Sequence, residues 1–319
     1  MTKNAWILVN RYCLTFNIYR PFLVDSSDFF YQIFKEFCII SSSVKYMKFN
    51  KFRSCVLWKD SVTISLAIVT AMETLLALLD VSMGDLVQCP WYGHLSILVL
   101  LFVVVTCGVA YRKTWLADKE VVLKIRGIKV TIKEGDLFKE PDWKLIPFNE
   151  FFDTKVDDVV IARNSLNGIF ITNYVKDLNQ FQKTIDEYPE QSTLKSKTKG
   201  GRKCYPLGKI IPYDDFLLLA LTHFEDNQAF ITHSDYEIGL RNMWLEICRV
   251  YANQPVALPL LGSGITRFKD CAEKKNSNLL RCMLCTLNSS MVQINQPITI
   301  ILRREILDEI NLYDLKKQF

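Results

Sequence analysis

Two long apolar runs constrain the architecture of this chain more than any other feature. The first covers residues 62–79 (VTISLAIVTAMETLLALL) and the second residues 95–111 (LSILVLLFVVVTCGVAY). Each is close to the roughly 20 apolar residues with which a helix crosses the hydrocarbon core of a bilayer. The first run begins well inside the chain and a second follows it, a pattern that does not fit a cleaved signal peptide. We therefore expect a two-helix transmembrane hairpin, with a buried helical hairpin of a soluble protein as the alternative.

Basic residues flank the expected hairpin at both of its ends. Those before the first run are Lys45, Lys48, Lys51, Arg53 and Lys59, and those after the second are Arg112, Lys113 and Lys119. The connecting residues 81–93 contain neither lysine nor arginine. Since lysines and arginines near a span remain on the cytoplasmic side, we expect a multi-pass protein of the cell inner membrane. Both termini and the whole region after the second run would face the cytoplasm.

The first run has a polar side. At about 100° per residue, one face of a helix would carry Thr63, Ala67, Thr70, Glu73, Thr74, Ala77 and Asp80. A carboxylate inside a span is costly, so we take Glu73, and with it Asp80 at the end of the run, as candidate residues for a function in the membrane. The alternatives are that Glu73 snorkels or sits protonated in a helix pair, and that Asp80 is an interfacial residue.

Residues 1–60 precede the first run and hold aromatic clusters without a clear period, so we assign them no function. Met47 is followed by the short basic lead KFNKFR shortly before the first run. This prompts the hypothesis that residues 1–46 are an upstream extension of the reading frame rather than a domain. The expected organisation is thus an N-terminal segment (1–60), a transmembrane hairpin (61–112) and a cytoplasmic domain (113–319).

Beyond the second run, short apolar runs alternate with helical patterns. Two strands are predicted around a turn in residues 121–132, and further strands at 145–148, 168–172, 209–212, 216–221, 255–260 and 297–302. Helices are predicted from a capping box at 234–237 (SDYE) through Val250, at 279–287 and at 305–315. This alternation predicts an α/β domain with a mixed or mostly parallel sheet flanked by helices. In such a domain, ligands bind beyond the carboxyl ends of the strands.

The composition and the short motifs exclude several kinds of protein. Lys plus Arg total 39 and Asp plus Glu 34, an excess too small to indicate a nucleic-acid partner. The ten cysteines have irregular spacings that do not form a secreted disulfide framework. The three histidines, His94, His223 and His233, stand in no metal-binding motif, and the lone C-x-x-C at Cys282 and Cys285 lies on an apolar helical pattern typical of buried thiols. The sequence lacks a P-loop and a Rossmann fingerprint, so we predict no metal, no cofactor and no catalytic residue.

Three loops next to predicted strands share one chemical character. In PLLGSGITRF, Gly262 and Gly264 let backbone N–H groups approach an anion closely. NSLNGIF offers a second glycine turn at Gly168, and KEGDLF places Asp136 just after a strand, where its carboxylate could accept a hydrogen bond from an exocyclic amine. A basic loop, KSKTKGGRK (residues 195–203), is either a solvated surface turn, which we favour, or a flexible flap that supplies positive charge to a phosphate.

These motifs, in this order, resemble those of macro domains, which bind ADP-ribose. The motifs are GD at 135–136, IPFNEFF at 146–152, NG at 167–168 and ALPLLGSGITRF at 257–268. With the two preceding runs and YPLGKIIPYDDFLLLALTHF at residues 205–224, the chain looks like the membrane-anchored macro-domain effectors of the bacterial Thoeris anti-phage systems. The resemblance extends from about residue 62 to the end of the chain. It implies a three-layer α/β fold in which helices flank a mixed sheet.

The resemblance also implies particular ligand contacts. Asp136, with Leu137 beside it, would contact the adenine amine, and Asn149 would lie near the distal ribose. The residues that would wrap the diphosphate through backbone amides are Asn167, Gly168, Gly262, Ser263, Gly264 and Ile265. These residue types also have purely structural explanations. Asp136 could cap a turn, Asn167 could be an ordinary left-handed residue, and Gly262 and Gly264 could be plain turn glycines.

One departure from the macro-domain pattern bears on function. The glycine triplet that macro-domain hydrolases place before their NG-like turn is replaced here by Ala162, Arg163, Asn164 and Ser165. Its loss favours sensing of a ligand over ADP-ribosyl hydrolysis. The resemblance implies that a TIR-domain partner makes a nucleotide second messenger derived from ADP-ribose, in this branch histidine-ADP-ribose. On sensing it, the protein would form a homo-oligomer and disrupt the lipid bilayer. The alternatives are a membrane-tethered ADP-ribosyl hydrolase or ADP-ribose phosphatase, and a structural membrane adaptor that binds no nucleotide.

Overall fold

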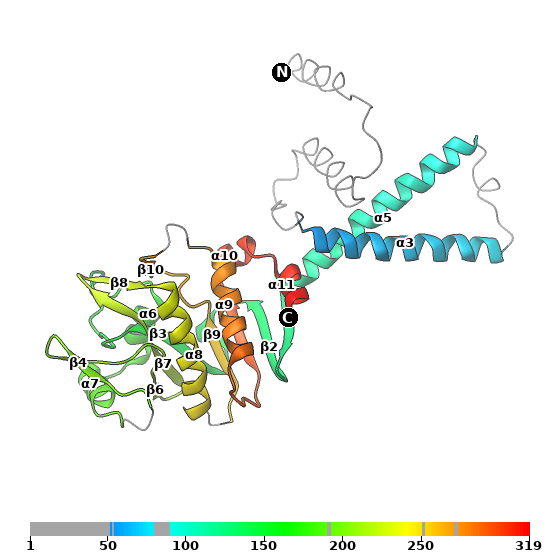
Figure 1. Ribbon diagram of the computed structural model, residues 1–319. Helices are drawn as coiled ribbons and strands as arrows, with labels where there is room; N and C mark the ends of the chain where they lie inside the picture. The colour runs from blue at the N-terminus through cyan, green and yellow to red at the C-terminus, as the bar shows by residue number, and fades with distance from the viewer. Residues whose placement is uncertain (1–51, 53, 80–89, 190–192, 251–252, 271–273) are drawn as a thin grey trace, which may run out of the picture. The chain divides into compact units, whose positions relative to one another are not determined.

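The computed structural model (Figure 1) describes residues 52, 54–79, 90–189, 193–250, 253–270 and 274–319. The chain divides into two units, Met1–Met47 and Lys48–Phe319. The proposed upstream extension, residues 1–46, and the candidate membrane residue Asp80 lie outside the described residues.

The two apolar runs form two long helices, α3 (Cys55–Leu78) and α5 (Trp91–Lys119). Both are long and apolar enough to cross a membrane, and only 11% of the most apolar window of each is buried. The expectation of a hairpin with apolar surfaces therefore fits, whereas the alternative of a buried core hairpin does not. The side chains buried on the two helices include small ones, which let packed helices approach closely: Ser61, Ser65, Thr106, Ala110 and Thr114.

The polar side of α3 faces away from these buried positions. Thr63, Thr70, Glu73 and Thr74 are all exposed. The hydroxyl of Thr63 donates to the carbonyl of Lys59 at 2.9 Å, and that of Thr74 to the carbonyl of Thr70 at 2.7 Å. The threonines thus satisfy their hydroxyls within the helix, and the face that carries Glu73 takes no part in the contact with α5.

Within the described residues, nine strands form one mixed sheet in the order β1-β2-β11-β9-β3-β7-β8-β10, with β6 paired to β7. The neighbours β2, β11, β9, β3 and β7 run parallel, while β1, β6 and β8 pair antiparallel with β2 or β7. The strands are β1 (Glu120–Ile125), β2 (Ile128–Glu134), β3 (Trp143–Asn149), β6 (Ile210–Tyr213), β7 (Phe216–Glu225), β8 (Gln228–Ile231), β9 (Val256–Pro259), β10 (Arg267–Phe268) and β11 (Ile298–Leu302).

Helices cover both faces of this sheet. They are the 3-10 turn η2 (Leu137–Lys139), α6 (Leu166–Tyr174), α7 (Leu178–Asp186), α8 (His233–Val250), α9 (Asn276–Ser289), α10 (Arg304–Glu309) and α11 (Leu312–Gln318). A separate two-stranded hairpin consists of β4 (Lys197–Lys199) and β5 (Arg202–Cys204).

Two apolar cores follow from the alternation of side chains along the strands. In β7, Leu217 and Leu219 belong to the core shared with α8 and α9, while Leu218 and Ala220 belong to the core shared with α6 and α7. Because successive side chains of a strand point to opposite faces, a fully apolar strand fills both cores at once. Burial on both faces is why β7 and β11 are continuous apolar runs. The three-layer mixed α/β fold predicted from the sequence is confirmed.

Three local predictions are corrected by the structure. Residues 168–172 were expected as a strand because Ile169, Ile171 and Thr172 are β-branched, yet they lie in α6. The helix forms because Ser165 caps it, accepting a hydrogen bond from the N–H of Gly168 at 3.2 Å. The reciprocal cap of α8 joins Thr232 and Asp235 rather than residues 234–237. The helix predicted at 305–315 is divided in two at Asn311, which caps α11.

A buried ion-pair network ties α8 to β6. Lys209 and Glu246 are both almost fully buried, and their charged groups lie 3.4 Å apart. Arg249 donates to both carboxylate oxygens of Glu246 at 2.9 Å, and the N–H of Ile210 donates to one of them at 3.3 Å. Glu246 therefore balances the charges of both Lys209 and Arg249.

Replacing Glu246 by alanine should lower the free energy of unfolding by about 3–5 kcal/mol, because it leaves buried Lys209 without its counter-charge. Chemical denaturation of the purified protein, followed by circular dichroism, measures the change. Glu237→Ala, on an exposed position of the same helix, is the matched control and should cost less than about 0.5 kcal/mol. Equal effects of the two substitutions would contradict this account of the network.

Candidate functional site at the carboxyl edge of the sheet

The loops singled out in the sequence meet at one edge of the sheet. Asp136 follows β2, Asn149 ends β3, and residues 260–266 follow β9. These strands run parallel, so their carboxyl ends share one edge. β3 pairs with β9 only at Trp143 and Lys144, whereas β9 pairs with β11 along its whole length. The pairing of β3 with β9 therefore ends at Lys144 and does not continue to this edge, which is where ligands bind in parallel α/β sheets.

Asp136 stands at the β2 side of this edge. Its carboxylate caps η2 by accepting a hydrogen bond from the N–H of Phe138 at 3.1 Å, and about half of its side chain is exposed. Leu137, in contrast, is 3% exposed and belongs to the core beneath the edge. Asp136 is thus placed to meet a ligand, while Leu137 supports the loop from below.

Asn149 organises the loop after β3. Its side-chain amide donates to Asp153 at 2.8 Å, and its side-chain oxygen accepts from the N–H groups of Phe151 and Asp153 at 3.1 and 3.3 Å. Asn149 is 8% exposed. All of these contacts are internal to residues 149–153, so a contact with the distal ribose stays a prediction that needs this loop to rearrange.

A buried carboxylate next to Asn149 was missed by the sequence analysis. Glu150 accepts from His223 at 2.7 Å and from Lys199 at 2.9 Å, and its side chain is 4% exposed. Burial alone would raise the pKa of Glu150, but the hydrogen bonds from His223 and Lys199 outweigh it and lower the pKa to about 2. The same hydrogen bond raises the pKa of His223, against the opposing effect of burial. The pairing of β3 with β7 brings Glu150 to His223, and that pairing has no local signal in the sequence.

The basic segment at 195–203 forms the hairpin β4–β5, whose residues 197–202 are all exposed, in keeping with the favoured interpretation as a solvated surface turn. Gly200 and Gly201 form its tip with φ of +59° and +75°, values that favour glycine. Lys199 pairs with Glu150, and Arg202 pairs with Asp153 and lies 4.3 Å from the centre of the Phe151 ring. Two charges of this hairpin, those of Lys199 and Arg202, are therefore balanced by carboxylates of the loop after β3.

Two side chains bond to backbone carbonyls of the loop after β9. The ammonium of Lys274 donates to the carbonyl of Gly264 at 2.6 Å, and the hydroxyl of Tyr236 donates to the carbonyl of Leu261 at 2.9 Å. Because a trans peptide points its N–H away from its C=O, these bonds turn the N–H groups of Ile265 and Gly262 to the opposite side. Such an array of N–H groups suits an anion.

Space is available around the tip of this loop. A Cβ built on Gly264 would meet no atom within 4 Å, and Ile265 is 69% exposed. Gly262 has φ of +76° and lies against the rings of Tyr236 and Phe268. Ser263 turns its hydroxyl back to the carbonyl of Leu260 at 2.6 Å. Of the four predicted loop residues, Gly262 and Ser263 shape the turn, and Gly264 and Ile265 are presented outward.

Asn167 and Gly168 lie in the first turn of α6. The N–H of Gly168 donates to Ser165 and to Asn167, and a Cβ at Gly168 would lie 2.2 Å from the carbonyl oxygen of Ala162. Gly168 is thus required for close packing of the helix start against the preceding backbone. Its amide is engaged in the helix cap, so its contact with a diphosphate stays a prediction.

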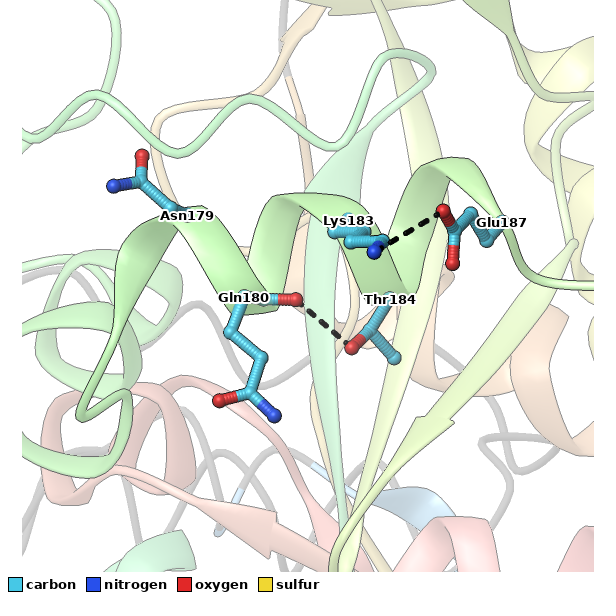
Figure 2. Close-up of a pocket in the computed structure, with 5 residues that line it drawn as sticks. All are labelled: Asn179, Gln180, Lys183, Thr184 and Glu187. Atoms are coloured by element: carbon cyan, nitrogen blue, oxygen red, sulfur yellow. Dashed lines mark hydrogen bonds and ion pairs between the residues drawn. The ribbon is translucent and has the colours of Figure 1, made fainter.

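A shallow hollow lies along α7 (Figure 2). It is lined by Asn179, Gln180, Lys183, Thr184 and Glu187, with Lys183 and Glu187 3.7 Å apart. All five side chains come from one exposed helix face, at the spacing of the helix itself. Because these lining residues belong to a single element, the hollow does not have the convergent polar groups of a ligand site.

One thiol of the cysteine motif is partly buried and the other is exposed. Cys282 and Cys285 lie on α9, and burial raises the pKa of Cys282 to about 11. A thiol of that pKa stays protonated at neutral pH and is a poor metal ligand or nucleophile. Among the described residues, no group of three or more His, Cys, Asp or Glu side chains is arranged to hold a metal ion.

The pair Glu150–His223 should be visible by NMR titration. We expect a pKa above 6.5 for His223, falling in Glu150→Gln because the anionic partner is lost. Ionised Glu150 contributes to the stability of the fold at pH values above the ordinary glutamate pKa of about 4.5. This contribution is lost as the pH falls toward 2. The stability contributed by protonated His223 is complete below pH 6.5, and it is lost as the pH rises through the raised pKa of this histidine. An unchanged His223 pKa in Glu150→Gln would contradict the assignment.

The two glycine loops should respond differently to one added methyl group. Gly168→Ala places its Cβ against the carbonyl of Ala162 and should destabilise the protein by about 1–3 kcal/mol, the usual cost of overpacking. Gly264→Ala meets open space and should change stability by less than about 0.5 kcal/mol. Thermal unfolding of both variants tests this, and a larger loss for Gly264→Ala would refute the packing described.

Comparison with known proteins places these features in a family. The family described as "Thoeris protein ThsA, Macro domain" matches residues 130–303. The protein "Thoeris protein ThsA" of Bacillus amyloliquefaciens (strain Y2) is 35% identical over 268 residues, covering 81% of this chain and 88% of that protein. Two solved structures of point mutants of an Oceanobacillus iheyensis macrodomain, the second of them with ADPR, are 14% and 13% identical. They cover 63% and 62% of this chain and 96% and 97% of their own, with TM-scores of 0.41 and 0.40.

The matched family region begins within β2 and ends just after β11, so it spans all three of the loops at the carboxyl edge. More than half of the chain matches the family, and the Bacillus relative extends the likeness over four-fifths of it. The chain therefore belongs to the Thoeris ThsA macro-domain family.

Proposed function

We propose that this protein is an anti-phage effector that senses an ADP-ribose-derived nucleotide at the carboxyl edge of its sheet. The specific ligand that we propose is the one implied by the family resemblance, histidine-ADP-ribose made by a TIR-domain partner. Binding would favour a homo-oligomer whose α3 and α5 helices disrupt the cell inner membrane, with both termini in the cytoplasm. A ligand can drive such a change only to the extent that it binds the assembled state more tightly than the dispersed one.

The loop after β9 is the observation that carries this proposal. Lys274 and Tyr236 donate hydrogen bonds to two of its carbonyls, and its tip at Gly264 and Ile265 is exposed. A backbone array of this kind suits the diphosphate of a nucleotide. Asp136, half exposed at the end of β2, supports an adenine contact at the same edge.

Catalysis is the less favoured alternative. A hydrolase needs a general base, and Glu150 is the buried carboxylate next to Asn149. Its pKa of about 2, set by His223 and Lys199, makes it a weak proton acceptor at neutral pH. We therefore propose a binding protein, and turnover of ADP-ribose derivatives by the purified protein would favour the hydrolase instead.

Direct titration tests the ligand. Calorimetry of the full-length protein in detergent should give tighter binding of histidine-ADP-ribose than of ADP-ribose, and no binding of a cyclic dinucleotide. The absence of a preference for any ADP-ribose derivative would remove the sensing proposal. Complete absence of nucleotide binding would favour the structural adaptor.

Gly264→Leu should separate binding from folding. The side chain would project into the open space at the loop tip, where we place the diphosphate, and should weaken binding by at least about tenfold, or about 1.4 kcal/mol. Membrane insertion and thermal stability should stay unchanged. Ile238→Ala, at an exposed position of α8, is the control and should bind as the wild type does. Wild-type affinity in Gly264→Leu would place the ligand elsewhere.

A further inference from the structure

The second long helix runs into the domain without a linker. α5 ends at Lys119 and β1 begins at Glu120. Ala117, in the last turn of α5, belongs to the same apolar core as Val121 and Leu123 of β1. α5 is therefore continuous with β1, and its last turn packs into the core of the domain. α3, by contrast, is connected to the domain along the chain only through residues 80–89 and α5.

The C-terminal helix α11 makes a direct polar contact with α3. The hydroxyl of Tyr313 donates to Asp60 at 2.6 Å, and the ammonium of Lys317 pairs with the same carboxylate at 2.7 Å. Ser54, the cap of α3, donates to Asp314. Asp60 lies in the second turn of α3, just before the apolar run, so this polar contact forms at the cytoplasmic end expected for the hairpin.

The same helix contacts α5 and is rooted in the domain. The ammonium of Lys113, on α5, lies 5.5 Å from the centre of the Tyr313 ring. α11 also places Leu312 and Leu315 in the apolar core of the domain. Tyr313 therefore bridges both long helices, while the leucines fix α11 to the sheet.

A short path links α11 to the candidate ligand edge. The N–H of Gly135, next to Asp136, donates to the carbonyl of Leu302 at the end of β11 at 3.2 Å. Arg304, the first residue of α10, pairs with Glu134 at 2.9 Å. α10 leads through Asn311 directly into α11. The Asp136 loop is thus bonded directly to the start of the C-terminal helices.

We propose that α11 is the tie that fixes α3 to the sensing domain, with Asp60, Tyr313 and Lys317 as positioning residues. A change at the Asp136 loop would reach α3 through β11, α10 and α11, and would reach α5 through β1. This inference rests on the proposed function for the nature of the signal and of the membrane response, but the tie itself is independent of both.

The test uses full-length protein in vesicles of phosphatidylethanolamine and phosphatidylglycerol. Asp60→Asn and Lys317→Met should leave the affinity for histidine-ADP-ribose within about twofold of the wild type, since neither residue lies at the carboxyl edge. Ligand-triggered release of an enclosed dye should fall by about 5- to 150-fold, the range of typical coupling free energies. Lys316→Met, on an exposed position of the same helix, is the matched control and should behave as the wild type.

Exchanging the charges of Asp60 and Lys317 distinguishes loss of this contact from general destabilisation of the protein. Asp60→Lys combined with Lys317→Asp restores an ion pair of opposite direction, and the Tyr313 hydroxyl can accept a hydrogen bond from the new lysine. The double variant should recover most of the dye release. Wild-type release in both single variants, or no recovery in the double variant, would overturn the proposal.

Amide hydrogen exchange tests the contact between α11 and α3 even if the protein does not respond to ligand. In the ligand-free protein, amides of α11 should exchange at least about tenfold faster in Asp60→Asn than in the wild type or in Lys316→Met. If the wild type neither binds an ADP-ribose derivative nor releases dye, the proposed function fails while faster exchange still supports the tie. Unchanged exchange in Asp60→Asn would overturn the tie whatever the ligand does.

Discussion

The parallel ladder β2–β11–β9–β3 is the constraint on which the rest of the structure depends. It brings the ends of strands that are distant in sequence to one edge, where Asp136, Asn149 and the loop after β9 meet. The shortest pairing in this ladder is that of β3 with β9, which is limited to Trp143 and Lys144 of β3. The carboxyl end of β3 is therefore not paired with β9, and this is where we place the ligand.

The ladder also explains how both cores are filled. Each central strand is apolar on both faces, so it packs against α8 and α9 on one side and α6 and α7 on the other. Polar groups buried beside these cores are balanced locally, as Lys209 and Arg249 are by Glu246. The same pairing occurs at the edge, where Glu150 balances His223 and Lys199.

Sequence periodicity predicted much of this architecture because long apolar runs and capped helices have strong local signals. The two long helices, the turn between β1 and β2 and the buried strands β3, β7, β9 and β11 were all predicted. Residues 168–172 were not, because β-branched residues at the start of a helix look like a strand until the cap at Ser165 is considered. The contacts that were missed depend on tertiary structure. Only the register of β3 with β7 brings Glu150 to His223, and Tyr313 reaches Asp60 across most of the chain length, where no local pattern can operate.

The central claim is that an ADP-ribose derivative binds between the loops at the carboxyl edge, and amide chemical-shift mapping of the labelled full-length protein tests it most directly. On addition of histidine-ADP-ribose, we expect the largest shifts at Asp136, at residues 149–153 and at Gly264 and Ile265. The amides of α7 that line the hollow in Figure 2 should stay unchanged. Shifts confined to α7, or no shifts at saturating ligand, would contradict the account.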